Sequence, residues 1–149
     1  KPDGITFLNV LSACWHAKAS LKVANRYFES MIYDYKIDPT VEHCSCLIKV
    51  MGCEGEIWRA EGVIKRLGFE SSGEVWRAVL AVCGGCGDLE VAEMAASKVI
   101  DLGGDMEFVY VMMSNIYAQF GKWEDARVVR KVMRDNNVIK EAGFSWIDI

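Results

Sequence analysis

The chain has 149 residues, of which 52% are hydrophobic and 26% charged, and its formal net charge is −4. It is too apolar for a disordered tail, and it contains no apolar run near the ~18 residues that a membrane span requires. An acidic chain also lacks the basic surface from which an autonomous nucleic-acid binder gains much of its affinity.

A six-residue motif occurs four times along the chain. It is clearest as Gly121-Lys122-Trp123-Glu124-Asp125-Ala126, and it recurs at 87–92, at 55–60 and, more weakly, at 19–24. Each copy has a small residue, a large apolar residue two positions later and an alanine five positions later. The copies start 36, 32 and 34 residues apart. A period in the low to mid-thirties is typical of a helical solenoid, whose units are too small to bury a core alone.

Apolar residues precede each motif at a helical spacing. They stand eleven, eight, five and four positions before it, which is one stripe on a helix of 3.6 residues per turn; the first column is Leu8, Cys44, Trp76 and Tyr110. A second stripe follows each motif, and Arg130 interrupts it in the fourth copy. Each unit is therefore predicted to form a first helix, a tight turn and a second helix.

In chain order, the first repeat is predicted over 1–37, with helices near 5–17 and 21–35, and the second over 38–69. The third and fourth follow at 70–104 and 105–138. Prolines at 2 and 39 each precede a first helix, where they cost least. Ser20 and Asp88 are expected to cap second helices. The pattern ends at 139–149, which we interpret as an extended tail that packs Trp146 on the last helix or enters a further module. We expect an all-α, right-handed solenoid of four helix-turn-helix repeats.

Several segments resemble one protein family. Residues 1–14 are similar to the last long-type repeat of plant pentatricopeptide repeat (PPR) proteins of the PLS class, and 38–44 to the opening of their last short-type repeat. Residues 92–96 and 113–118 resemble their two E motifs, and 143–147 the junction after them. The whole chain thus resembles the C-terminal region of these organellar RNA-editing factors. It departs from them at Ala142 and Phe144, where proline and cysteine are usual, and at 70–73, where an acidic, proline-containing linker is usual.

The resemblance implies tetratricopeptide-like (TPR-like) E-motif hairpins at 70–104 and 105–138. It implies a non-catalytic role in C-to-U editing, in a mitochondrion or chloroplast: repeats before Lys1 would select single-stranded RNA, and the E motifs would hold a cytidine deaminase domain or another editing protein. It also assigns base reading to the fifth position of a first helix and the last position of the same repeat, here Ser45 and Ser72. In the first repeat the fifth position is Leu8, which cannot hydrogen-bond to a base.

No chemistry is expected from the chain itself. The zinc deaminase signature, His-x-Glu with a later Cys-x-x-Cys, is absent, because neither His16 nor His43 has glutamate two positions later. We expect both histidines to be solvated or to cap helices. The cysteine pairs 83/86 and 44/46 fit buried apolar positions better than half of a zinc or redox site. No cofactor, metal or membrane contact is expected.

Two surfaces are candidates for partners. Four basic residues spaced i, i+3, i+4 and i+7 are predicted to share one face of the last helix: Arg127, Arg130, Lys131 and Arg134. That face is either solvated and paired with neighbouring acids or a dock for phosphate or an acidic partner segment. Trp76 and Trp123 are expected in the core. Trp58 is expected to be exposed, because its equivalents are polar, and Trp146 is a further candidate contact.

Two other functions stay open. The repeats themselves could bind a specific RNA in splicing or RNA stabilisation, which predicts salt-sensitive affinity that depends on Ser45 or Arg130. The chain could also be a general TPR-like scaffold for protein interactions, which fits a solenoid equally well.

Overall fold

The computed structural model describes residues 1–86 and 88–135, and its regular secondary structure within them consists of helices joined by short turns and loops. The helices are α1 (Gly4–His16), α2 (Leu21–Tyr33), α3 (Val41–Cys53), α4 (Ala60–Leu67), α5 (Gly73–Cys86), α6 (Leu89–Asp101), α7 (Met106–Gln119) and α8 (Trp123–Asp135), with a 3₁₀ turn, η1 (Ile57–Arg59), before α4. The all-α prediction is confirmed. The predicted tail, 139–149, lies outside the described residues, and the hand of the superhelix stays a prediction.

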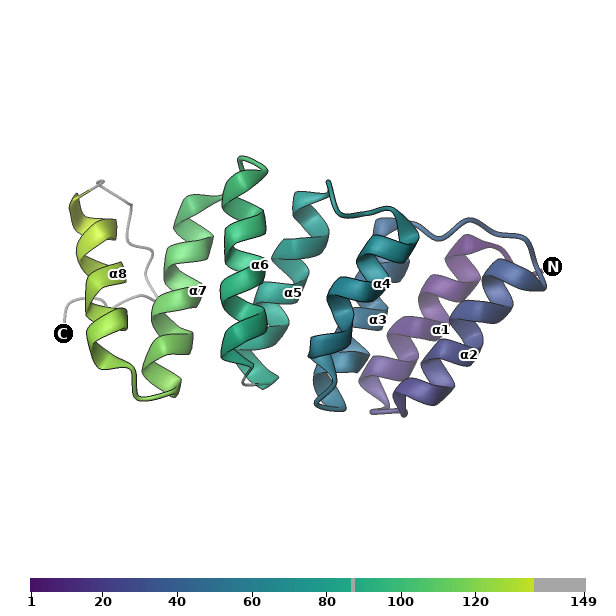
Figure 1. The fold of residues 1–149 in the computed structure, drawn as a ribbon. Helices are drawn as coiled ribbons and strands as arrows, with labels where there is room; N and C mark the ends of the chain where they lie inside the picture. Colours follow the sequence, from purple (N-terminus) through teal and green to yellow (C-terminus); the bar gives the residue numbers. More distant parts are fainter. Residues whose placement is uncertain (87, 136–149) are drawn as a thin grey trace.

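Helical hairpins are stacked in one elongated row, with α1 and α2 at one end and α8 at the other (Figure 1). Each first helix packs against the next first helix, so that α1, α3, α5 and α7 form a continuous layer. Each second helix lies against its own partner, and α2 and α6 also contact the first helix that follows. This is the solenoid architecture predicted from the repeat period.

Polar side chains begin the helices. The hydroxyl of Ser20 and the carboxylate of Asp88 accept hydrogen bonds from backbone amides three residues later, as predicted. The same arrangement caps α1, α3 and α7 through Asp3, Thr40 and Asp105. The second helix of the second repeat differs, because it begins as η1 and no side chain caps η1 or α4.

The turns between paired helices require a left-handed residue. Gly55 and Gly121 supply it with φ of 72°, and the next amide bonds back to a carbonyl five residues earlier. In the first hairpin the same position is taken by Lys18, with φ of 54°, and the amide of Ala19 bonds to Cys14. The alignment of Ala19 with Gly121 was therefore wrong by one residue, and Ser20 is one extra residue in this turn.

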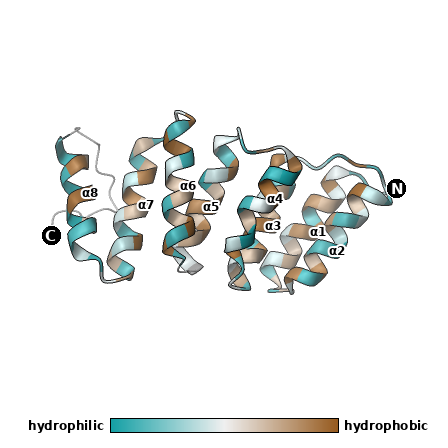
Figure 2. Cartoon of the chain, in the orientation of Figure 1, coloured by the Kyte–Doolittle hydropathy of each residue, from teal (hydrophilic) through white to brown (hydrophobic). Residues whose placement is uncertain are grey.

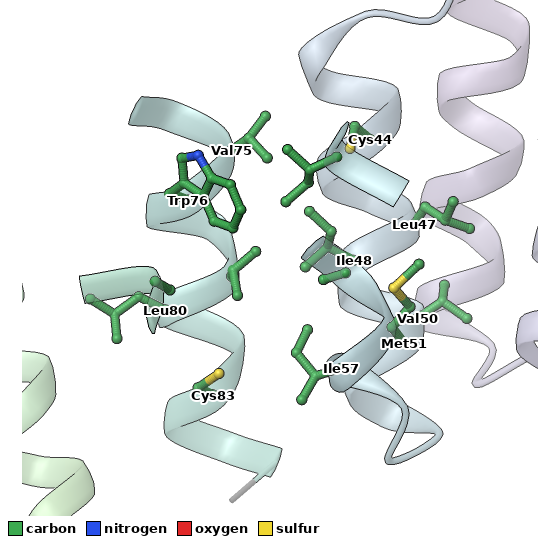
Figure 3. Packing of buried hydrophobic residues seen from close by; sticks show 14 of the residues in the cluster. Cys44, Leu47, Ile48, Val50, Met51, Ile57, Val75, Trp76, Leu80 and Cys83 are labelled. Atoms are coloured by element: carbon green, nitrogen blue, oxygen red, sulfur yellow. The ribbon is translucent and has the colours of Figure 1, made fainter. Parts of the chain in front are cut away.

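Buried apolar side chains form a core that runs from α1 to α7. Figure 3 shows its centre, where Ile48 of α3 and Ile57 of η1 face α5, which carries Val75 and Trp76. Trp76 is fully buried, as predicted, and its indole Nε1 donates a 2.8 Å hydrogen bond to the carbonyl of Glu70. Figure 2 shows hydrophobic and hydrophilic residues interleaved along the helices, as expected where one face packs and the other meets solvent.

Candidate interaction surfaces

The layer of first helices carries an apolar groove of about 440 Å³ between α1, α3 and α5. Small residues form much of its wall, among them Gly52, Ala78 and Ala81. At its rim the ammonium of Lys49 lies 4.8 Å from the ring centroid of Trp15, a cation–π contact. The sequence analysis missed this groove. The available signal was the small residues at 78, 81 and 85 along α5, which leave the face open.

The two serines expected to read a base lie near the N-termini of neighbouring helices. Ser45 is the fifth residue of α3 and is half-buried. Ser72 directly precedes α5, and its hydroxyl accepts a 3.4 Å hydrogen bond from the amide of Val75. The helices that carry them, α3 and α5, pack against each other. A base contact by either serine stays a prediction.

The four basic residues of α8 do not share one exposed face. Arg130 is only 9% exposed, and its Nε donates a 3.1 Å hydrogen bond to the hydroxyl of Ser114 in α7. The prediction of a single four-residue face was therefore wrong for Arg130. Its position is the eighth of the second helix, and Phe28, Ile64 and Ala96 are buried there in the other hairpins. The packing position of this column thus overrode the charge.

The other three basic residues of α8 are exposed. The guanidinium of Arg127 is paired with the carboxylate of Glu124 at 2.7 Å, on a side chain that is 68% exposed. Such a surface pair contributes little stability. Lys131 and Arg134 are exposed further along the helix. Docking of a partner or phosphate on these residues stays a prediction.

Two tryptophans in the described part of the chain are exposed. Trp58 is 64% exposed, which confirms the expectation, and Arg59 lies 5.8 Å from its ring centroid. Beside it a shallow cavity of about 320 Å³ is lined by Arg59, Gly62, Val63 and Arg66. Trp123 was expected in the core, and that expectation was wrong, because it is 59% exposed. Trp146 lies outside the described residues.

His43 is a capping residue that also joins two hairpins. The amide of Thr40 donates to its Nδ1 at 3.0 Å, so the ring proton lies on Nε2, which donates to the carbonyl of Gly4 at 2.8 Å. The expected capping role is thus confirmed for this residue. His16, at the end of α1, is exposed.

Several cysteine thiols are buried in the core. Cys14, Cys44 and Cys83 are buried, as expected for Cys44 and Cys83. Burial raises the pKa of Cys44 to about 12 and also raises that of Cys14, so neither forms the reactive thiolate at neutral pH. Cys53 is exposed at the end of α3. In the part of the chain that the structure describes, no three His, Cys, Asp or Glu side chains gather to hold a metal ion.

Polar contacts also join the later hairpins. The hydroxyl of Tyr117 in α7 donates a 2.8 Å hydrogen bond to Glu93 in α6, and Gln119 donates to the carbonyl of Gly84 at 3.0 Å. Burial, followed by the bond to Glu93, raises the pKa of Tyr117 to about 12. These bonds fix the fourth hairpin on the third. None of the described helices is long and apolar enough to cross a bilayer.

The sequence of the chain is similar to those of known proteins. The model of the E motif matches residues 86–148, from the last residue of α5 through α8 and beyond the described residues. A putative PPR-containing protein of Arabidopsis thaliana is 46% identical over 99% of this chain and 26% of its own length. Two Arabidopsis relatives named mitochondrial and chloroplastic are 40% and 35% identical, over 99% and 100% of the chain.

The chain spans at most about a quarter of the length of these relatives, 14% of the mitochondrial and 17% of the chloroplastic protein. The likeness nevertheless extends along practically all of this chain, and its second half carries the E-motif match. The chain belongs to the pentatricopeptide repeat family and contains an E motif.

Proposed function

We propose that the chain is a non-catalytic module of an organellar RNA-editing factor. In this role it recruits or positions a cytidine deaminase domain, or a separate deaminase protein, next to RNA held by further repeats. The observation that carries the proposal is the E-motif match over 86–148, whose last described helix, α8, exposes Trp123 and three basic side chains. Names of two relatives support a mitochondrion or chloroplast as the location.

The stacking of the hairpins supports a positioning mechanism. The first helices pack in one layer. Hydrogen bonds tie the second hairpin to the first through His43, and the fourth hairpin to the third through Tyr117 and Gln119. A solenoid of this kind transmits a fixed distance between its ends. A base recognised before α1 and a deaminase held near α8 would then be kept at a constant spacing, which selects the cytidine that is edited.

The side chains that could in principle take part in catalysis have structural roles instead. His43 caps α3, Arg130 bonds to Ser114, and Cys14, Cys44 and Cys83 are buried in the core. The chain also carries a net charge of −4, which disfavours tight RNA binding by these residues alone. Both features favour a role in protein contact over catalysis or autonomous RNA recognition.

A second candidate function is direct RNA binding by these repeats. The specific observation in its favour is the groove beside Trp15 and Lys49, since a half-buried aromatic ring next to a cation can stack a base near a phosphate. In that case Ser45 and Ser72 would act in splicing or RNA stabilisation.

The test compares two functions of the same protein. The chain is titrated with single-stranded RNA over a salt series, beside a longer version that carries further repeats before Lys1. Immobilised chain is also titrated with a recombinant cytidine deaminase domain. We expect the chain to bind the deaminase domain and only the longer version to bind RNA. Tight, sequence-dependent RNA binding by the chain alone, with a steep salt dependence, would overturn the proposal in favour of the second function.

A further inference from the structure

The exposure of Trp123 contrasts with its equivalents in the other hairpins. The first residue of each second helix is apolar and is followed three positions later by a buried alanine. These first residues are Leu21, Ile57, Leu89 and Trp123. Leu21 is 4% and Ile57 2% exposed, and Leu89 is half-buried against the core, whereas Trp123 is 59% exposed.

The next hairpin covers this position in the earlier repeats. The amide of Leu21 donates a 3.0 Å hydrogen bond to Glu54, which ends α3, and η1 contacts α5. In the third hairpin the fifth residue of α6, Glu93, accepts a hydrogen bond from Tyr117 of α7. In the first three hairpins, the start of the second helix therefore forms one side of the interface with the next hairpin.

The corresponding positions of α8 face no helix in the described part of the chain. Helix α8 stands at the end of the row in Figure 1. Its fifth residue, the equivalent of Glu93, is Arg127, so the charge at this position is reversed. Lys131 and Arg134 continue the same flank at spacings i+4 and i+7 from Arg127, and both are exposed.

We propose that this flank docks an acidic α-helix of a partner protein, stacked on α8 as α7 is stacked on α6. We name it the α8 edge and define it by four residues: Trp123, Arg127, Lys131 and Arg134. The inference rests on the proposed function, in which the partner is the recruited editing protein. The partner helix would cover the indole of Trp123 with apolar side chains and place a carboxylate opposite Arg127, where Tyr117 stands opposite Glu93.

The composition of the edge fits such an occupant. Tryptophan and arginine are the residues most often found at the energetic centre of protein interfaces. The buried contact between Arg130 and Ser114 holds α8 on α7, so the edge is ordered before it binds. Arg127 is paired with Glu124 at 2.7 Å in an exposed pair that a single partner carboxylate can join. Glu124, Asp125 and Asp135 on the same helix would repel the continuous charge of a phosphate backbone more strongly, which favours a discrete carboxylate over RNA.

The repeat itself supplies a probe. Two hydrocarbon-stapled peptides copy residues 105–121, which include α7, one with Tyr117→Glu and one with Tyr117→Lys. They are titrated into the whole chain by fluorescence anisotropy. We expect the Glu peptide to bind about tenfold more tightly than the Lys peptide. Trp123→Ala should weaken the Glu peptide by about tenfold or more, and Arg127→Glu should reverse the preference between the two peptides.

The matched control is Trp58→Ala, which removes a similarly exposed tryptophan from η1. This variant should bind both peptides as tightly as the wild-type chain does. Equal affinities of the two peptides, absence of binding by both, or insensitivity to Trp123→Ala would overturn the proposal.

The same variants are then tested for binding of the cytidine deaminase domain. If deaminase binding survives Trp123→Ala and Arg127→Glu, the α8 edge is wrong and the recruiting function stands. If the Glu peptide binds as expected but the deaminase domain does not, the edge stands and the recruiting function is wrong.

Discussion

The Nε atom of Arg130 lies 3.1 Å from the hydroxyl oxygen of Ser114, and both residues are buried where α8 meets α7. An arginine in a column of apolar residues is tolerated only if its polar groups have partners. The hydrogen bond to Ser114 satisfies the buried guanidinium of Arg130, and it also specifies how α8 is rotated against α7. Exposure of the remaining flank of α8 follows from that rotation.

Loss of this hydrogen bond should destabilise the chain. Ser114→Ala removes the acceptor at a fully buried site, and we expect the free energy of unfolding to fall by about 1–3 kcal/mol. The measurement is urea unfolding followed by circular dichroism. Ser97→Ala, at an exposed position of α6, is the control and should change stability by less than about 0.5 kcal/mol. Equal stability of the two variants would show that Ser114 contributes nothing to the orientation of α8.

The fold could be predicted from the sequence because the repeat states it several times. Equivalent positions such as 14, 50, 82 and 116 are apolar in every copy of the repeat. Where one copy carries an ambiguous residue, the other three copies still indicate whether the position is buried. The caps at Ser20 and Asp88 depend only on neighbouring residues and were also predictable. The turn at Lys18 was not, because lysine rarely adopts a left-handed backbone and the sequence offered Ala19 as the closer match to glycine.

The candidate surfaces were less predictable, because they depend on which neighbour covers a side chain. Trp123 occupies a column that is buried or half-buried in the other hairpins, and only the arrangement of α8 in the row leaves it exposed. For Arg130 the error was opposite, since its charge suggested exposure and its column led to burial. At the last described hairpin the average of the repeats therefore holds for Arg130, which packs against a neighbour, and fails for Trp123.

His43 should contribute to stability through two hydrogen bonds at once. His43→Ala removes the bond that caps α3 and the bond to Gly4, which joins α1 and α3. We expect the free energy of unfolding to fall by about 2–3 kcal/mol, because a part-buried capping amide and a part-buried carbonyl both lose their partner. Urea unfolding of His16→Ala, an exposed histidine, provides the comparison and should show a loss below about 0.5 kcal/mol. A similar small loss in both variants would contradict a structural role for His43.

Lys18 should be improved by glycine. Its φ of 54° places a side chain in the left-handed region, where Cβ crowds the backbone. Lys18→Gly should therefore raise the free energy of unfolding by about 0.5–1 kcal/mol, in spite of the greater entropy that glycine gives the unfolded chain. Lys22→Gly, in the right-handed first turn of α2, is the matched control and should have the opposite sign. Thermal unfolding separates the two, and destabilisation by both would show that Lys18 is not strained.

Tyr117 should ionise late in the folded protein. Burial and the bond to Glu93 raise its pKa from 10.0 to about 12. Because the folded state favours the neutral phenol, the unfolded chain loses this proton first. The stability that Tyr117 contributes is then complete below about pH 10 and is lost as the pH rises toward 12. Cys44, whose pKa is raised from 9.0 to about 12, adds a loss of the same sign that begins near pH 9.

The phenol can be followed by its absorbance at 295 nm, and the difference between the wild-type chain and Tyr117→Phe isolates its titration. Glu93→Gln keeps a hydrogen-bond acceptor but removes the negative charge, so the transition should move from about 12 toward 10. The move should be incomplete, because burial is the largest cause of the shift and persists in the variant. A transition that stays in place after Glu93→Gln would show that α6 and α7 are not joined through this carboxylate.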